Sequence, residues 1–279
     1  MKRMLTVFSL LITLMFMISC EREFSDEVYD EMSYWTDNYF QQNNVMTPDP
    51  GSRIIDAKVD GVWSQFELKK FPESFMEWNT GRRIATLDRF RRMERPELAG
   101  PHNGIVATYG IRRSDTQFKL NNAVKGLGFV PKYEKLPEIL ELLESTKDDE
   151  LEQKLDVLQH LYENAEEFFD LDKQGSLELY SVPEFETQSF LNQMTNPIST
   201  IVFLDIPSFK LKTIVRLLHP EDPDLTEYEK MLIRYVNDVY QYFHGDPGKD
   251  YSTVIYYVTE IYDNSPGRPD ARGLKVTGE

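Results

Sequence analysis

The residues of this sequence best suited to bind a ligand lie between positions 170 and 178. Oxygen-bearing side chains occupy every second position there: Asp170, Asp172, Gln174, Ser176 and Glu178. Carboxylate, amide and hydroxyl oxygens are hard ligands, and Ca²⁺ binds six to eight of them. The spacing makes calcium a candidate ligand here, and no other cofactor is expected.

The same stretch resembles an EF-hand calcium loop, D-x-[DN]-x-[DN]-G-x-x-x-x-x-E. Asp170, Asp172 and Gln174 stand at the first, third and fifth positions, and Gly175 stands at the turn. The twelfth position holds Ser181, where the EF-hand has a bidentate glutamate. The resemblance implies calcium binding, and the alternative is an Asp/Gly-rich turn between a helix and a strand, with no metal.

A second candidate site is a basic island between positions 79 and 125. Ten Lys or Arg and four acids give this stretch a net charge of +6. Arginine forks suit phosphate, sulfate or carboxylate groups, so the island predicts an anionic ligand or an acidic partner. The alternative is that the arginines pair with acids of their own chain. The arginines are Arg82, Arg83, Arg89, Arg91, Arg92, Arg95, Arg112 and Arg113.

Asp205 ends an apolar run over 198–205 and precedes Ser208, so it is a candidate either for a catalytic site or for a helix cap. None of the four histidines (102, 160, 219 and 244) has a histidine or cysteine three or four residues away. The motifs HExxH, GxSxG and GxxxxGK[ST] do not occur. Whether the protein is an enzyme is therefore uncertain, and the sequence favours a protein without catalysis.

Cys20, the single cysteine, cannot form an internal disulfide. Lys2 and Arg3 precede an apolar run over 4–18 that spans about 22 Å as a helix, shorter than a bilayer core of about 30 Å. Such a run is typical of a signal peptide.

Met17-Ile18-Ser19-Cys20 resembles the lipobox of bacterial lipoproteins. The resemblance implies a signal peptide over 1–19, lipidation of Cys20 with fatty acids such as palmitate, and an outer-membrane anchor. The acidic cluster behind Cys20 resembles surface-export signals. Both a periplasmic and a surface-exposed face therefore remain open.

The charge balance excludes some functions. The chain has a net charge of −16, and removal of 1–19 takes away two cations and no acid, which leaves −18. Such acidity argues against nucleic-acid binding. Hydrophobic residues at 41% and aromatic residues at 13% predict a folded core.

The residues after the signal predict three regions. Residues 20–51 form an irregular acidic tether in which Val28, Met32, Trp35 and Tyr39 share one face of a short helix. Residues 52–263 form the globular region, with a lobe boundary near 131–137. The Gly- and Pro-containing tail over 264–279 is predicted to be flexible.

Local patterns favour an α+β fold that is helix-rich and has a few short strands. A hairpin is expected over 52–71 with its turn at Asp60-Gly61, because this dipeptide lies between two alternating runs. A strand is expected over 198–205, residues 104–110 fit a short buried strand or an apolar loop, and residues 253–261 fit either strand or helix. Helices are expected over 73–95, from Pro137, over 149–169, over 208–218 and over 226–243.

Together these features predict a lipid-anchored envelope protein that is a binding or accessory subunit of an outer-membrane or surface assembly. Its expected partners are the membrane, through the N-terminal lipid, and an envelope protein or anionic ligand, with no nucleic acid. Two alternatives remain: an envelope hydrolase with a distributed acid/His site, and a calcium-stabilised surface ligand-binding protein.

Overall fold

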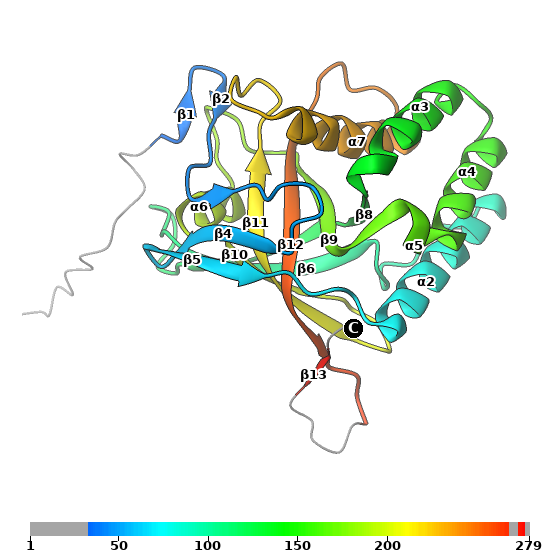
Figure 1. The fold of residues 1–279 in the computed structure, drawn as a ribbon, viewed down its shortest axis with the longest axis horizontal. Coiled ribbons are helices and arrows are strands. Elements are labelled where there is room, and N and C mark those ends of the chain that lie inside the picture. The colour runs from blue at the N-terminus through cyan, green and yellow to red at the C-terminus, as the bar shows by residue number, and fades with distance from the viewer. Residues whose placement is uncertain (1–32, 268–272, 277–279) are drawn as a thin grey trace, which may run out of the picture.

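The computed structural model describes residues 33–267 and 273–276. Cys20 and the segment that resembles a signal peptide lie outside these residues, so their predicted roles stay predictions. The described chain forms one large antiparallel sheet, a small three-stranded sheet and a group of helices along one side (Figure 1).

The large sheet has eight strands, all paired antiparallel. They are β6 (Asn103–Tyr109), β7 (Leu120–Gly126), β8 (Gly128–Pro131), β9 (Phe169–Glu178), β10 (Ile198–Val202), β11 (Phe209–Leu218), β12 (Ser252–Asp263) and β13 (Leu274–Val276). Their order is β7-β6-β10-β11-β12-β9-β8, and β13 pairs with β12.

The large sheet is rolled so that its two ends meet. Strands β7 and β8 stand at opposite ends of the order, yet only Leu127 separates them in the chain. Neighbouring Cα atoms are 3.8 Å apart, so the two ends of the sheet must lie beside each other there. We call this junction of β7 with β8 and β9 the seam. An ion pair between Lys125 of β7 and Glu178 of β9, 2.5 Å long, bridges it. The roll therefore closes at Leu127.

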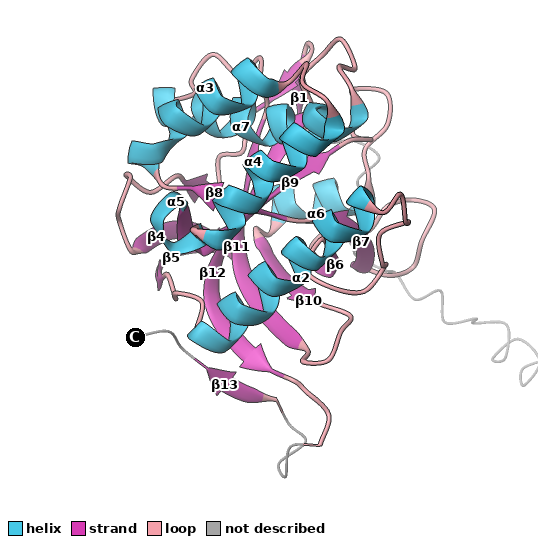
Figure 2. Cartoon of the chain, turned by 90° about the vertical axis from the view of Figure 1, so that its right-hand side faces the viewer, coloured by secondary structure: helices cyan, strands magenta, loops and turns pink. Residues whose placement is uncertain are grey.

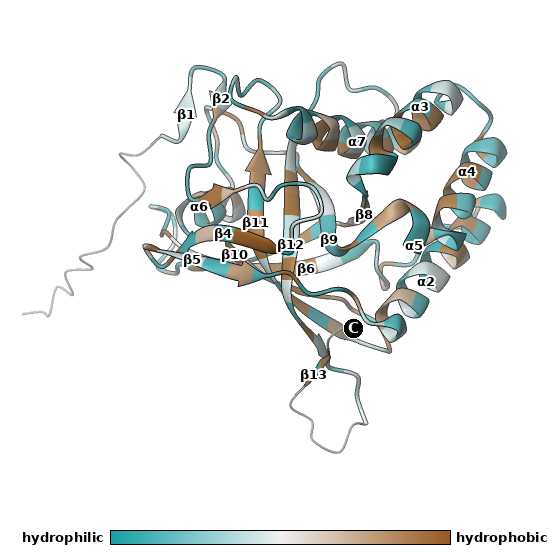
Figure 3. Ribbon diagram, in the orientation of Figure 1, coloured by the Kyte–Doolittle hydropathy of each residue, from teal (hydrophilic) through white to brown (hydrophobic). Residues whose placement is uncertain are grey.

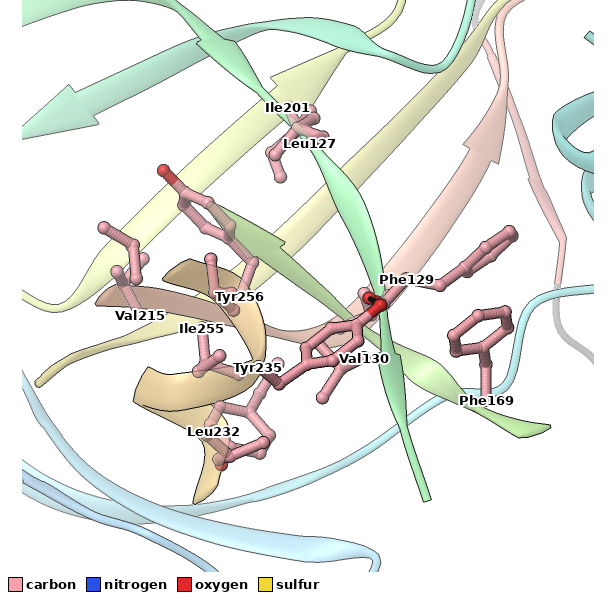
Figure 4. Packing of buried hydrophobic residues seen from close by; sticks show 14 of the residues in the cluster. Leu127, Phe129, Val130, Phe169, Ile201, Val215, Leu232, Tyr235, Ile255 and Tyr256 are labelled. Atoms are coloured by element: carbon pink, nitrogen blue, oxygen red, sulfur yellow. Dashed lines mark hydrogen bonds between the residues drawn. The ribbon is translucent and has the colours of Figure 1, made fainter. Parts of the chain in front are cut away.

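The inside of the roll is a packed apolar core. Val106, Ile201 and Leu211 are fully buried at facing positions on three neighbouring strands. Gly104 lets these side chains pack close to the strand, because a Cβ there would stand 2.5 Å from Leu127 Cδ1 and 2.7 Å from Ile201 Cγ2. Figure 4 shows Leu127 and Ile201 together in this core, and Figure 3 shows that hydrophobic residues are concentrated in β11 and β12.

Helices cover one side of the roll (Figure 2). Helix α2 packs against α4, and α3 packs against α7. Their bounds are α2 (Glu73–Arg91), α3 (Leu136–Thr146), α4 (Leu151–Glu163), α5 (Ala165–Phe168), α6 (Gln188–Thr195) and α7 (Glu227–His244), with a 3₁₀ turn, η2, at Tyr133–Lys135. The expected capping box opens α7, where Thr226 accepts from the Glu229 amide.

The small sheet consists of β3 (Val45–Met46), β4 (Ile54–Val59) and β5 (Val62–Glu67) in that order. The predicted hairpin is confirmed, because Asp60 and Gly61 both have positive φ, 49° and 83°, as a type I′ turn requires. In Figure 1 this sheet lies in front of β10 and β6.

The second half of the predicted tether belongs to the folded domain. Strands β1 (Trp35–Thr36) and β2 (Tyr39–Phe40) form a small hairpin where a helix was expected. Phe40 is only 1% exposed and contacts the rings of Trp35 and Phe190. The first half of the tether, residues 20–32, lies outside the described residues.

The prediction of a helix-rich fold with a few short strands is wrong. Strands and helices are nearly equal in extent across the described residues, and the eight-stranded sheet organises the domain. The expected helix over 208–218 is strand β11, and the expected loop at 170–181 begins in strand β9. Strand β11 pairs with a strand on each side, and Thr213, Ile214 and Val215 are all buried, so both of its faces are covered and its sequence lacks clear period-2 alternation. Strand β9 does alternate, and its polar side chains at every second position are the ones predicted to be metal ligands.

Candidate functional site

The arginines of the basic island do not form one surface. Arg91 pairs with Glu152 and Asp156 of α4, at 2.9 and 2.8 Å, and so joins two helices. Others bind near their own position in the chain: Arg89 to Glu94 and Glu97, Arg92 to Glu94, Arg113 to Asp115, and Arg112 to the Thr116 carbonyl. Arg95 lies exposed on the loop after α2. The arginines that were expected to share helix sides are therefore mostly held by groups of their own chain.

Asp205 and Arg82 form a structural contact. Arg82 donates from two nitrogens to the two Asp205 oxygens, at 2.7 and 2.5 Å, and Trp78 Nε1 donates at 2.9 Å. Burial alone would raise the pKa of Asp205, but these hydrogen bonds outweigh it and lower the pKa. Asp205 thus fixes the loop after β10 onto α2, and no helix follows it.

Arg83 lies at the seam of the roll and is 2% exposed. It donates to the carbonyls of Pro101 and Leu127, at 3.1 and 2.9 Å, and its guanidinium lies 5.0 Å from the centre of the Phe129 ring. Arg83 Nη1 also lies 3.4 Å from His102 Nδ1. Arg83 therefore supports the seam from inside, and it is not available to a soluble ligand.

The five predicted calcium ligands do not converge on one point. Lys173 Nζ lies between Asp170 and Asp172, at 2.7 and 2.9 Å. Glu178 instead pairs with Lys125 and accepts from Ser181. Because β9 is extended, Gln174, Ser176 and Glu178 share one face of the strand, and Lys173 lies on the other. Within residues 33–267 and 273–276, no group of three His, Cys, Asp or Glu residues is arranged to hold a metal.

A groove of about 490 Å³ lies between the small sheet and the outer face of the large sheet. We call it the edge groove, because β5, the edge strand of the small sheet, forms one wall. Its lining comes from six strands and the segment after β5: Gln65, Phe66, Glu67, Lys69, Ala107, Thr108, Tyr109, Leu120, Ile198, Ser199, Thr200, Lys212, Thr213, Ile214, Thr259 and Glu260.

The charges of the edge groove are balanced in pairs. Lys212 binds Glu260 at 2.9 Å, and Lys69 binds Glu67 at 2.5 Å. A hydrogen bond from Tyr262, together with Lys212 and Lys275, lowers the pKa of Glu260 to about 2 against the effect of burial. Glu260 is therefore ionised at neutral pH, and these pairs leave no net charge for a ligand of either sign to neutralise.

The floor of the edge groove continues into an exposed apolar area on β6 and β7. We call this area the open face; its residues are Ile105, Ala107, Tyr109, Leu120, Asn122 and Val124. Strand alternation puts all six on the outer side, and Leu120 and Val124 are 61% and 70% exposed. None of the six is charged. Exposed apolar areas next to a groove are typical of binding surfaces.

Sequence reasoning missed both surfaces. The edge groove is assembled from strands far apart in the chain, so no local motif reports it. The open face has no clear local signal either, because apolar and polar residues do not alternate regularly over 105–109 or over 120–124. The residues at 104–110 were expected to be a short buried strand or apolar loop, which hid the exposed face.

Comparisons with known proteins assign no family. No family model matches the chain, and a search of curated proteins finds no match. One solved structure that the chain is similar to is a Clostridium acetobutylicum protein related to general stress protein 26, of the pyridoxinephosphate oxidase family. It is 10% identical, with a TM-score of 0.32, over 70% of this chain and 93% of that one. This similarity is too low to carry an argument about fold or function.

No helix within the described residues has the length and hydropathy that crossing a membrane requires.

Proposed function

We propose that this protein is a lipid-anchored envelope protein that acts as a binding or accessory subunit of an outer-membrane or surface assembly. The observation that carries the proposal is the edge groove together with the open face. They form a continuous, charge-balanced and partly apolar surface on a chain whose net charge is −16. Binding surfaces between proteins are depleted in charge at their centres.

The N-terminal sequence supports the location. Cys20 is the only cysteine and follows a signal-like apolar run, so acylation there would hold the folded domain at the outer membrane. Several acyl chains give stable anchoring, whereas one chain binds only marginally. We propose that the open face binds another protein of the same envelope. A neutral surface has no positive charge with which to bind an anionic glycan.

The test is affinity purification from detergent-solubilised membranes, followed by mass spectrometry. Leu120→Ser with Val124→Ser removes exposed apolar surface, while Leu151→Ser changes a comparably exposed leucine on α4. We expect defined envelope proteins to co-purify with the native chain and with Leu151→Ser, and to be lost from the double variant. Cys20→Ala should reduce the recovery by releasing the chain from the membrane.

The same set of co-purifying proteins from all of these variants would refute the proposal. No observation favours the hydrolase alternative, since Asp205 is fully occupied by hydrogen bonds. Calcium binding stays a prediction, and a melting temperature that is unchanged by calcium and by a chelator would remove it.

A further inference from the structure

We infer that the edge groove takes an extended peptide segment of a protein partner, which adds to β5 as a further strand of the small sheet. This inference deepens the proposed function and rests on it. Strand addition needs an edge strand with unpaired backbone groups, room beside that edge and side-chain contacts for alternate residues of the segment.

The backbone of β5 has three residues whose polar groups point away from its partner strand. A two-residue turn makes Val59 and Val62 a hydrogen-bonded pair, and such pairs alternate along an antiparallel hairpin. The amides and carbonyls of Trp63, Gln65 and Glu67 therefore point away from β4, toward the free edge.

Two further hydrogen bonds confirm this alternation. Lys58, opposite Trp63, donates its amide to Asn44 and so points away from β5. Leu68, two residues beyond Phe66, donates to Arg53 across the hairpin, as a hydrogen-bonded position must. No strand of the described residues pairs with this edge of β5, which extends over Trp63–Glu67, about 17 Å at 3.4 Å per residue.

The edge of β5 already makes one bond to the large sheet. The amide of Lys69, which points to the same side as that of Glu67, donates to the Val258 carbonyl of β12 at 2.8 Å. A register shift between Lys212 and Thr213 of β11 leaves Thr259 of β12 outside the pairing at this point. Beyond Lys69 the two sheets separate, and the edge groove lies between them.

The hairpin is held rigidly in position. At its turn, Asn196 Nδ2 donates to Asp60 Oδ1 at 2.9 Å, and the Asp60 amide donates back to Asn196 Oδ1 at 3.3 Å. The bond from Lys69 to Val258 fixes the other end. A template that is already ordered lowers the entropic cost of binding a peptide.

The floor of the edge groove indicates what the segment carries. Ile198, Ile214 and Tyr109 supply apolar contacts. The Lys212–Glu260 and Lys69–Glu67 pairs are each neutral, because one cation binds one anion in each. A strand in the edge groove turns every second side chain toward this floor. The segment that fits is therefore extended and uncharged, with apolar residues at alternate positions.

Hydrogen exchange followed residue by residue tests the geometry without any variant. In the free protein the amides of Trp63, Gln65 and Glu67 should exchange fast, and those of Ser64 and Phe66 slowly. The probe is a peptide selected from a phage-displayed library of random segments of about nine residues, longer than a usual strand. Its binding should slow exchange at Gln65 and Glu67.

A matched pair of variants tests the role of the backbone. Gln65→Pro removes an amide that β4 does not use, so the hairpin should remain, whereas Gln65→Ala keeps the amide. We expect Gln65→Pro to weaken binding of the selected peptide about tenfold or more and Gln65→Ala to leave it within about twofold. N-methylation should abolish binding where it modifies a peptide amide that faces β5, and such amides occur at every second residue. N-methylation at the residues between them should leave binding intact.

Three results would overturn the inference. They are a library that yields no binding peptide, binding that tolerates both Gln65→Pro and N-methylation at every residue, and peptide binding that leaves exchange of the β5 amides unchanged. Each of these results leaves the proposed function standing if Leu120→Ser with Val124→Ser still loses the envelope partners. If that variant keeps them, the proposed function fails as well.

Discussion

At the scale of single residues, the least expected group is Arg83. Its place in the basic island predicts a ligand for anions, but it is buried at the seam among carbonyls, an amide oxygen and aromatic rings. A buried guanidinium stays charged, so these neutral acceptors must replace its water. Its charge in turn acts on His102 beside it.

The pKa of His102 gives a pH prediction. Burial, and then the charge of Arg83, lower this pKa from 6.5 to about 3. In the unfolded chain His102 is protonated as the pH falls below 6.5, whereas in the folded chain it stays neutral down to about pH 3. The free energy of unfolding therefore falls as the pH drops below 6.5. Between about pH 7 and about pH 5 this loss amounts to about 2 kcal/mol.

The variant His102→Gln should remove that part of the pH dependence, and it keeps an acceptor for Arg83. Urea unfolding at several pH values measures the slope in both proteins. His219, whose pKa burial also lowers, still contributes in the variant, so the comparison is a difference of slopes. Equal slopes would show that His102 is protonated in the folded protein.

At the scale of elements, the contact between β6 and α6 depends on one glycine. A Cβ on Gly110 would stand 2.8 Å from both the Cα and the carbonyl oxygen of Asn192 in α6. These are backbone atoms and cannot rotate away. Helix α6 also holds the end of this strand through the Asn192 side chain, which accepts from the Ile111 amide at 3.1 Å.

We therefore expect Gly110→Ala to lower the free energy of unfolding by about 1–3 kcal/mol, as overpacking in a closed site does. Gly126→Ala is the matched control, because nothing lies within 4 Å of the Cβ that it adds. Chemical denaturation of both variants makes the comparison. A Gly110→Ala protein as stable as Gly126→Ala would mean that α6 can move away from β6.

The elements also differ in how well their sequences report them. The β4–β5 hairpin and helix α7 were predicted correctly, because a type I′ turn at Asp60-Gly61 and a capping box at Thr226 are local signals. The reading of 208–218 as a helix failed. The segment Phe209–Leu218 pairs with strands on both sides, and its partners in β12 lie 35 or more positions away in the chain.

At the scale of the whole molecule, the seam decides whether the large sheet is open or closed. Arg83 bonds to Pro101 and Leu127, and the Leu127 amide donates to His102 at 2.9 Å. These contacts join α2, the start of β6 and the β7–β8 connection. Loss of Arg83 should therefore weaken the fold as a unit.

We expect Arg83→Met to destabilise the protein by about 3–5 kcal/mol, since it leaves buried carbonyls without donors. Arg92→Met, at an exposed arginine on the end of the same helix, should change stability by less than about 1 kcal/mol. Thermal unfolding followed by circular dichroism distinguishes them. Similar melting temperatures for the two variants would contradict a structural role for Arg83 at the seam.

The sequence by itself determined the local features of this protein: the hairpin turn, the capped helices and the lipobox-like segment that ends at Cys20. Each depends on residues a few positions apart, so it can be read from a short window. Only the tertiary structure decided the closure of the sheet, the pairing of the arginines, the edge groove and the open face. These depend on which distant strands and helices pack together, and that choice is set by burial and hydrogen bonding over the whole chain.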